Sequence, residues 1–300
     1  MNPSYIKLCK SGELEERISK LYEILKDCKL CPRECGVDRT IGERGYCRSG
    51  EELLVSSIHP HYWEEEPLVG LYGSGTVFLT NCNLGCIYCQ NYDISNLGCG
   101  SPMSTYDLAM NMIKLQKKGC HNINLVTPTH FVPQLTKSIK IAAEKGLKIP
   151  IVYNCGGYES LETLKLLEGI VDLYMPDIKY SDPINAKKYS NAPDYFEVCK
   201  KAVKEMHRQV GDLKIYNGIA QRGLLIRHLV LPNGIAGSEE VLRFIASLSK
   251  DTYINIMLQY RPMYKAEKYE ELNRPIKARE YNKVVDFAKR LGLHRGFENP

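Results

Sequence analysis

Residues 76–91, TVFLTNCNLGCIYCQN, combine a strand-like run with three closely spaced cysteines. The apolar and β-branched run at residues 76–80 is typical of a buried strand, and Cys82, Cys86 and Cys89 follow it within eight residues. Three thiolates in so short a loop can hold three corners of a cubic 4Fe-4S cluster and leave the fourth iron open to a small molecule. Zinc would need a further ligand from Cys99 or a distant histidine, or a catalytic site with only three protein ligands. The odd number of thiols therefore favours an iron-sulfur cluster.

Five further strand-like runs follow this first one, and stretches of helical length separate them. The runs are residues 122–126, 149–153, 171–175, 224–231 and 253–259, and the helical stretches lie near residues 104–118, 132–146, 159–168, 185–208, 238–248 and 276–291. Strands that alternate with helices pair in parallel, because a parallel partner is reached only through a long, right-handed crossover. The pattern predicts an α/β fold, either a partial barrel or a doubly wound open sheet.

Residues capable of binding or catalysis follow several of these strands. Such positions are occupied by Asn81-Cys82 and by residues 127–130, 154–157, 177–179 and 259–261. In parallel α/β folds the carboxyl ends of the strands carry the site, which favours a barrel-like arrangement with one shared mouth. Side chains two residues apart on a strand face the same side, so Asp177 and Lys179 can reach one ligand, or else form only an ion pair.

The pattern Cys-x3-Cys-x2-Cys, with Tyr88 just before the last cysteine, resembles the radical S-adenosylmethionine (SAM) superfamily. The resemblance implies a partial (β/α)6 barrel with a small Cys-rich N-terminal extension, and a 4Fe-4S cluster at Cys82, Cys86 and Cys89. It also implies that this cluster reductively cleaves SAM to methionine and a 5'-deoxyadenosyl radical, which abstracts hydrogen from a substrate. Because iron-sulfur potentials reach roughly −700 mV, we expect an external low-potential electron donor of the flavodoxin or ferredoxin type.

Residues after the other strands resemble the SAM contacts of the glycyl radical enzyme activases. Asp177 and Lys179 are similar to the DxK pair of these activases, and Arg227 is similar to an arginine that reaches SAM. The activases usually carry a Gly-Gly-Glu motif after the second strand, where it receives the amino group of SAM, whereas this chain has the sequence VTPTH at residues 126–130. His130 is a candidate acid or base that faces the substrate, with a turn or helix-start role as the alternative. The implied cofactor-binding residues are Cys82, Cys86, Tyr88, Cys89, Thr127, Thr129, Asn154, Gly156, Asp177, Lys179, Arg227 and Gln259.

The resemblance extends over about residues 28–290 through the runs NINLVTPTH, PIVYNCGGYE, VDLYMPDIKY, RHLVLP and NIMLQY. Together they resemble uncharacterised iron-sulfur proteins described as homologues of pyruvate formate-lyase activating enzyme. The implied substrate is a glycine of a glycyl radical enzyme, with a small molecule or a peptide as the alternative. A zinc-stabilised binding protein or redox carrier without turnover is the alternative from another class.

Four more cysteines, Cys28, Cys31, Cys35 and Cys47, lie within twenty residues near the N-terminus. Four thiolates can close a tetrahedral zinc site, or hold a second 4Fe-4S cluster that has no open iron. A zinc site would be structural, and a second cluster could relay electrons toward the SAM cluster. Unmetallated or redox-active thiols are the third interpretation.

The length and hydrophobic pattern predict the organisation of the chain. With 300 residues, 44% of them hydrophobic, it can form one large domain or two smaller ones. We expect residues 1–72 to form a Cys-rich metal-binding segment with a helix at about residues 12–26 and a linker-like stretch near His59-Pro60 and residues 64–67. Residues 73–270 are expected to form the barrel, and residues 271–300 a C-terminal helix packed on it.

Charge and composition exclude several classes of partner. The net charge of +5 is spread along the chain without a long basic run, which argues against nucleic acid. No apolar run approaches the ~18 residues needed to cross a bilayer, so no membrane partner is expected. The start lacks the apolar block of a secretory signal, and twelve cysteines indicate metal or redox chemistry in a reducing cytoplasm.

Overall fold

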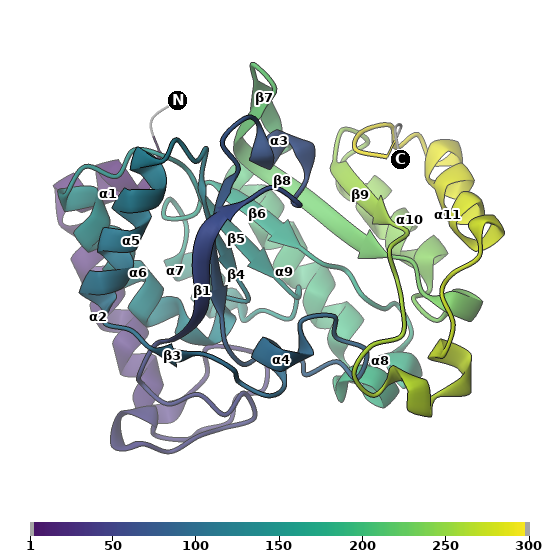
Figure 1. The fold of residues 1–300 in the computed structure, drawn as a ribbon, viewed down its shortest axis with the longest axis horizontal. Coiled ribbons are helices and arrows are strands. Elements are labelled where there is room, and N and C mark those ends of the chain that lie inside the picture. The colour runs from purple at the N-terminus through teal and green to yellow at the C-terminus, as the bar shows by residue number, and fades with distance from the viewer. Residues whose placement is uncertain (1–2, 298–300) are drawn as a thin grey trace.

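A single curved sheet forms the centre of the protein in the computed structural model, which describes residues 3–297. The strand order is β3-β1-β2-β4-β5-β6-β8-β7, with β9 paired to β8. Figure 1 shows the strands crossing the molecule, with helices behind the sheet and at both of its sides. Within residues 3–297, β9 pairs with neither β1 nor β3, so the barrel is open along one side.

Six strands run parallel and confirm the six predicted ones. They are β2 (Ser74–Leu79), β4 (Ile123–Val126), β5 (Ile151–Cys155), β6 (Leu173–Pro176), β8 (Ile219–Leu229) and β9 (Tyr253–Met257). Each pairs with the next along this series. β4, β5 and β6 are buried at every position, as expected for parallel strands covered on both faces. The fold is the predicted α/β partial (β/α)6 barrel.

The connections between these strands are mostly helical, as the apolar periodicity predicts. The helices are α5 (Thr105–Lys117), α6 (Val132–Glu144), α7 (Leu161–Leu166), α8 (Pro183–Ser190), α9 (Tyr195–Val210), α10 (Ser238–Leu248) and α11 (Ala278–Arg290). The prediction of one helix over residues 185–208 is wrong, because Asn191 adopts a left-handed conformation with φ of 48° and ends α8. Asp182 caps α8 by accepting a hydrogen bond from the Asn185 amide at 2.9 Å.

The expectation of a linker near His59-Pro60 is also wrong. This region forms β1 (Leu54–His61), which lies antiparallel to β2 from Val55 opposite Leu79 to His61 opposite Ser74. The two-residue strand β3 (Ser101–Pro102) pairs with its other edge. β1 lies before residue 72 and its partner after it, so both sides of the expected domain boundary contribute to one sheet. The division itself stays a prediction.

A second addition to the sheet is the hairpin of β7 (Lys214–Tyr216) and the start of β8. Asn217 and Gly218 connect the two strands with φ of 49° and 77°. This is the backbone of the tight Asn-Gly turn that matches the twist of antiparallel strands. The expected strand at residues 224–231 therefore begins earlier, at Ile219.

The N-terminal region packs on the barrel helices. α1 (Tyr5–Ser11) and α2 (Glu13–Glu23) are separated by Gly12, which has a φ of 82°. Leu14, Ile18 and Leu21 form the buried face of α2, as their spacing predicts. The remaining short helices are α3 (Glu66–Val69), α4 (Tyr92–Ser95) and the 3-10 turns Ile24–Asp27, Arg39–Ile41, Thr129–Phe131, Pro232–Gly234, Ala266–Lys268 and Glu270–Leu272.

The amino end of the sheet is closed by α3, which lies above the strands in Figure 1. Leu68 of α3 is 1% exposed, and Asn122, just before β4, donates a hydrogen bond to its carbonyl at 2.9 Å. Leu68 belongs to a small apolar cluster that also contains Val152, Leu173, Met175, Leu213, Ala220 and Leu225. We call this cluster the floor of the barrel.

No helix within residues 3–297 has the length and apolar character required to cross a membrane.

Candidate functional site

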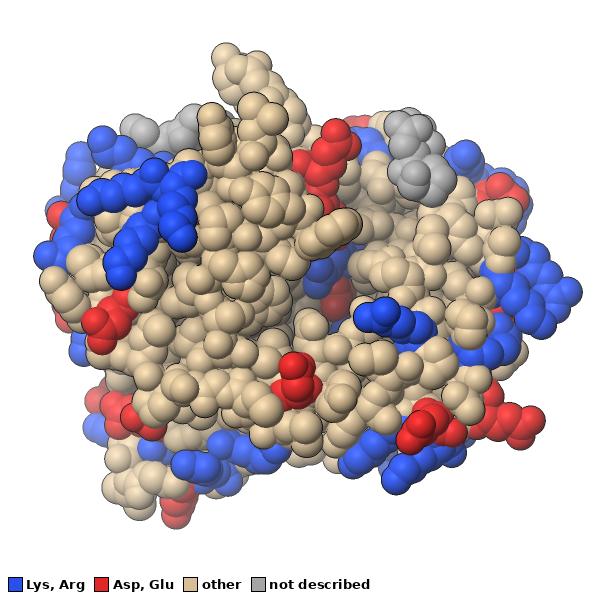
Figure 2. Space-filling model, in the orientation of Figure 1, with Lys and Arg blue, Asp and Glu red and all other residues tan. Residues whose placement is uncertain are grey.

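A cavity of about 220 Å³ opens at the carboxyl ends of the strands. We call this end the mouth of the barrel. Figure 2 shows the molecule hollowed near the middle of this view, with basic and acidic side chains inside. The residues that line the cavity are Cys86, Tyr88, Cys89, Gln90, Asn91, Asp177, Lys179, Arg227, Leu229, Met257 and Gln259. Seven of these belong to the cofactor site predicted from the sequence, so residues from four different strand ends meet in one place.

The cysteine loop leaves β2 through two left-handed residues, Asn81 with φ of 66° and Gly85 with φ of 62°. Hydrogen bonds reach all three sulfurs. The Leu84 amide donates to Cys82 Sγ at 3.3 Å, the Ser190 hydroxyl donates to Cys86 Sγ at 2.9 Å, and Cys89 Sγ lies 3.1 Å from the Ser95 hydroxyl. Burial raises the pKa of Cys82 to about 12, so without metal its thiol is protonated.

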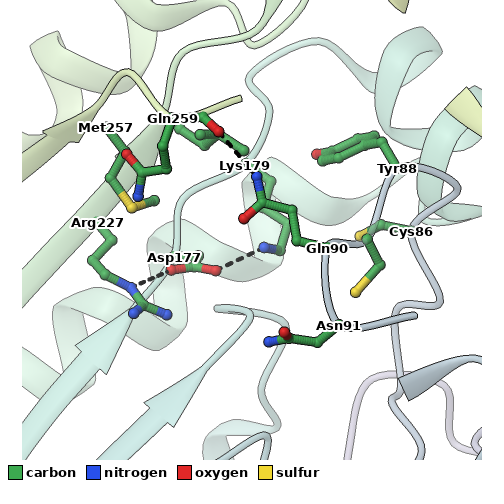
Figure 3. Close-up of a pocket in the computed structure, with 11 residues that line it drawn as sticks. Cys86, Tyr88, Gln90, Asn91, Asp177, Lys179, Arg227, Met257 and Gln259 are labelled. Atoms are coloured by element: carbon green, nitrogen blue, oxygen red, sulfur yellow. Dashed lines mark hydrogen bonds and ion pairs between the residues drawn. The ribbon is translucent and has the colours of Figure 1, made fainter. Parts of the chain in front are cut away.

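Three soft sulfur donors in one short loop fit an iron-sulfur cluster. Within the part of the chain that the structure describes, no three His, Cys, Asp or Glu side chains converge closely enough to bind a single metal ion. A cubic cluster makes no such demand, because each thiolate binds a different iron. Cys86 and Cys89 point into the cavity region, as Figure 3 shows for Cys86. The donor set therefore suits a cluster that these three thiolates would hold beside the cavity.

A chain of opposite charges lies beside this loop. Lys179 Nζ is 2.7 Å from Asp177 Oδ2, and Arg227 Nε is 2.7 Å from Asp177 Oδ1 (Figure 3). Burial alone would raise the pKa of Asp177, but Arg227 and Lys179 outweigh it and hold that pKa at about 2. All three side chains are therefore charged at neutral pH. They present a carboxylate and two cations to a ligand in the cavity.

Neighbouring residues fix this charge chain in place. Asn154 Oδ1 accepts a hydrogen bond from Arg227 Nη2 at 2.7 Å. Gly156 leaves room for the cysteine loop, because a Cβ there would lie 2.7 Å from Leu84 Cδ1. Gln259 lines the cavity, and its backbone carbonyl accepts a hydrogen bond from Gln90 Nε2 at 3.1 Å. Gln259 thus lines the cavity directly, whereas Asn154 and Gly156 lie outside its lining and contact Arg227 and the cysteine loop.

Tyr88 forms an apolar wall of the site. It is 5% exposed, and its ring packs edge-on against Tyr180 and Tyr260 at centroid distances of 6.2 and 6.0 Å. Leu229 and Met257 add apolar surface to the same cavity. The charged group thus lies beside an apolar surface, where electrostatic interactions are stronger than in water.

None of residues 127–130, which follow β4, lines the cavity. Thr127 turns the chain with φ of 59°, and its amide donates to the Asn154 carbonyl at 2.8 Å. Thr129 donates to Glu159 at 2.8 Å, and His130 Nε2 lies 2.7 Å from the Thr80 carbonyl. Thr129 and His130 are buried outside the cavity lining, and burial lowers the pKa of His130 to about 3.

Glu64 reaches the charged group without any signal in the sequence. Its Oε2 lies 3.3 Å from Arg227 Nη1, and its side chain is 8% exposed. Burial raises its pKa to about 7, and Arg227 only partly offsets this. Glu64 follows β1, whose last residue pairs with the first residue of β2, so it approaches Arg227 from the floor end. By contrast, the spacing after Cys89 could have indicated Gln90 and Asn91, which directly continue the cysteine loop.

The four N-terminal cysteines lie apart from the cavity. Cys28, Cys31 and Cys47 are buried, and Cys35 is partly exposed. Burial raises the pKa of the Cys31 thiol, and Cys47 and Cys28 raise it further. None of the four lines the cavity at the mouth.

Comparisons with known proteins identify the family and relatives of this chain. The model of the radical SAM superfamily matches residues 76–219. An uncharacterized protein of Methanocaldococcus jannaschii is 30% identical over 297 residues, which cover 96% of this chain and 82% of that protein. Pyruvate formate-lyase-activating enzyme of Clostridium pasteurianum is 26% identical over 230 residues, which cover 73% of this chain and 87% of that enzyme.

Among solved structures, native anSMEcpe with bound AdoMet and Cp18Cys peptide matches with a TM-score of 0.47 and 14% identity. The match covers 72% of this chain and 60% of that one. Native anSMEcpe with bound AdoMet matches with a TM-score of 0.48 and 13% identity, over 70% of this chain and 57% of that one. This chain therefore spans less than two thirds of either structure.

Proposed function

The chain belongs to the radical SAM superfamily, and from this membership we propose that it cleaves SAM at a 4Fe-4S cluster bound by Cys82, Cys86 and Cys89. When bound, such a cluster supplies the electron that splits SAM into methionine and a 5'-deoxyadenosyl radical, which takes a hydrogen atom from the substrate. The observation that supports this most is the shared cavity. Two of the three cluster cysteines line it together with Asp177, Lys179 and Arg227.

The charged group at the mouth is proposed to bind and orient SAM. Lys179 and Arg227 offer cations to the carboxylate of its methionine part, and Asp177 offers an acceptor to its amino or hydroxyl groups. Asp177 contacts both cations at 2.7 Å before SAM binds, so the three side chains are already ordered and little side-chain entropy is lost on binding. Asn154 helps to hold the Arg227 guanidinium by accepting a hydrogen bond from Nη2.

Other predicted site residues complete the proposal. The usual Gly-Gly-Glu acid has no counterpart after β4, so we propose that the carbonyl and hydroxyl of Thr127 accept from the SAM ammonium instead. Tyr88, Leu229 and Met257 are proposed to exclude water and shield the radical, because they give the cavity its apolar wall. Gly156 and Gln259 shape the space next to the cluster loop.

For the substrate we propose a glycine of a glycyl radical enzyme. The similarity to pyruvate formate-lyase-activating enzyme of C. pasteurianum supports this choice. The open side of the barrel supports it too, because a peptide loop can enter there. The reaction needs an external low-potential donor, and we propose one of the flavodoxin or ferredoxin type. None of the twelve cysteines forms a disulfide bond within residues 3–297, which supports work in a reducing cytoplasm.

The test is anaerobic incubation of the reconstituted protein with SAM and dithionite. We expect 5'-deoxyadenosine and methionine in equal amounts, and an absorbance band at about 400 nm from the cluster. The Cys86→Ala protein is the negative control. A colourless, iron-free protein that releases no 5'-deoxyadenosine would overturn the proposal.

A second measurement addresses the substrate. Deuterium at the reactive glycine of a candidate glycyl radical enzyme should appear in 5'-deoxyadenosine, and a stable protein radical should form. Deuterium transfer from a small molecule or a short peptide, with none from any glycyl radical enzyme, would replace the glycine proposal and keep the SAM chemistry.

A further inference from the structure

The four N-terminal cysteines are carried by two turns that face each other. Gly36 donates to the Cys28 carbonyl at 3.2 Å and Cys28 donates to the Val37 carbonyl at 3.0 Å, which closes a loop around Cys31 and Cys35. A second turn, closed by the Arg48 amide and the Gly45 carbonyl at 2.9 Å, presents Cys47. We call residues 28–47 the four-thiol segment.

The two turns contact each other through the sulfur atom of Cys35. The Tyr46 amide donates a hydrogen bond to Cys35 Sγ at 3.3 Å. A Cβ at Gly45 would lie only 2.6 Å from the same sulfur, so a glycine is needed there. The cysteine loop at the mouth shows the same kind of contact, where the Leu84 amide donates to Cys82 Sγ at 3.3 Å. Amide donors to sulfur stabilise the thiolate form that binds metals.

Three side chains within or next to the four-thiol segment donate hydrogen bonds to the cysteine loop at the mouth. Arg33 Nε donates to the Asn83 carbonyl at 2.9 Å, between Cys82 and Cys86. The Tyr46 hydroxyl donates to the Leu84 carbonyl at 3.2 Å. Arg48 Nη2 donates to Asn81 Oδ1 at 3.3 Å, just before Cys82.

Arg33 is the best anchored of the three. Its guanidinium lies 3.8 Å from the centre of the Tyr46 ring and 5.2 Å from that of Tyr158. It also donates to the Ser190 carbonyl at 3.0 Å, and the Ser190 hydroxyl in turn donates to Cys86 Sγ at 2.9 Å. The four-thiol segment therefore touches the cluster loop directly and through the residue that bonds to Cys86.

We propose that Cys28, Cys31, Cys35 and Cys47 bind a thiophilic metal centre of their own, and that this centre holds Arg33, Tyr46 and Arg48 against the loop of the SAM cluster. The metal is either one zinc ion or one 4Fe-4S cluster, since four thiolates saturate both. Binding a single zinc ion would draw the sulfurs closer than they now lie. The role in positioning the loop rests on the proposed function of that loop, whereas the metal site itself does not.

Metal analysis of the anaerobically purified full chain tests the site. The triple variant Cys82→Ala, Cys86→Ala, Cys89→Ala removes the iron of the mouth, so any metal that remains belongs to the four-thiol segment. We expect about one zinc or about four irons per chain in this variant. The further changes Cys31→Ser and Cys47→Ser should each remove that metal, and Cys9→Ser in α1 is the matched control. A triple variant without metal overturns the proposed site. So does a triple variant whose metal content is unchanged by Cys31→Ser and Cys47→Ser.

The positioning role is tested in the chain with all cysteines intact. Arg33→Gln should leave the metal of the four-thiol segment in place but make iron loss from the mouth to a chelator several-fold faster. It should also weaken the spectroscopic change that SAM causes in the reduced cluster, and Arg33→Lys should restore part of it. Iron loss at the wild-type rate in Arg33→Gln would overturn this role. If the wild-type mouth holds no iron, the proposed function fails, while the metal count of the triple variant still decides the four-thiol site.

Discussion

At the mouth of the barrel, thiols and charged side chains surround an open cavity, whereas at the floor apolar side chains close the sheet around Leu68. The same strands carry both ends. Their amino-terminal residues, such as Val152 and Leu173, pack in the floor, and the residues after their carboxyl ends reach the cavity. The comparison indicates a division of labour, in which the floor supplies folding free energy and the mouth supplies chemistry.

One residue connects the two ends. Arg227 lines the cavity, and it contacts Asp177 at the mouth and Glu64 from the floor side. The pKa of Asp177 is held at about 2 by its two cations, whereas burial raises that of Glu64 to about 7. The same guanidinium therefore serves a carboxylate that is always ionised and one that titrates near neutral pH.

The largest effect is expected from removing a thiol at the mouth. Cys86→Ala should reduce 5'-deoxyadenosine formation to background, because two thiolates cannot hold a cluster with one open iron. The matched control is Cys120→Ala, which removes another buried thiol that lies outside the cavity lining. Product analysis by chromatography distinguishes them, and comparable turnover in both proteins would break the division between mouth and floor.

The next effect concerns charge at the mouth. Asp177→Asn should weaken SAM binding by about tenfold or more, since about 1.4 kcal/mol corresponds to tenfold and losing a buried, charged partner costs at least that. Lys179→Ala should act in the same direction. Glu280→Gln is the control, because Glu280 also has a pKa of about 2 beside an arginine, Arg274, but lies outside the cavity lining. Calorimetric titration with SAM measures the affinities, and an unchanged affinity in Asp177→Asn would reduce the pair to a structural ion pair.

A third change tests the floor. Leu68→Ala should lower the free energy of unfolding by about 2–5 kcal/mol, because it leaves a cavity in a fully buried apolar cluster. The dissociation constant of SAM should change by less than about twofold. Leu71→Ala, at a side chain that is 85% exposed, is the control. Denaturant titration measures the loss, and a fall in SAM affinity as large as that of Asp177→Asn would show that the two ends are not separate.

The smallest effect is a dependence on pH that starts at the floor side. The folded pKa of Glu64 is about 7, above its ordinary value of 4.5, so the folded state gains less from ionisation than the unfolded state. Its contribution to stability is therefore fully present below pH 4.5 and is lost as pH rises through 7. Between pH 6 and pH 8 this loss is roughly 1 kcal/mol. Glu64→Gln should remove it, whereas Glu66→Gln at an exposed position should not. If the free energy of unfolding changes equally between pH 6 and pH 8 in the wild-type, Glu64→Gln and Glu66→Gln proteins, the assignment is contradicted.

The sequence predicts the parallel strands and the cysteine loop because both depend on local pattern. Apolar runs separated by helical lengths locate β2, β4, β5, β6, β8 and β9, and the cysteine spacing identifies the loop. β1 escapes prediction, since His59, Pro60 and His61 give it no apolar alternation, and its identity as a strand depends on pairing with β2.

The site residues differ in predictability for a similar reason. Asp177, Lys179 and Arg227 lie on or next to strands, where the period of two still governs which way they point. Thr129 and His130 lie beyond Thr127, whose φ of 59° turns the chain and ends that period. Glu64 reaches Arg227 across 163 positions of the sequence, a contact that no local pattern encodes.

The hydrogen bond from Ser190 to Cys86 sets an order of events during biosynthesis. Its two partners lie 104 positions apart, and Arg33 depends on the same end of α8 through the Ser190 carbonyl. On a ribosome adding about 5–20 residues per second, the cysteine loop emerges roughly 5–20 s before the residue that completes it. Iron delivered to the nascent chain in that interval meets an unfinished loop. A nascent chain that ends before residue 190 therefore carries all three cysteines of the loop but lacks the hydroxyl that donates to Cys86.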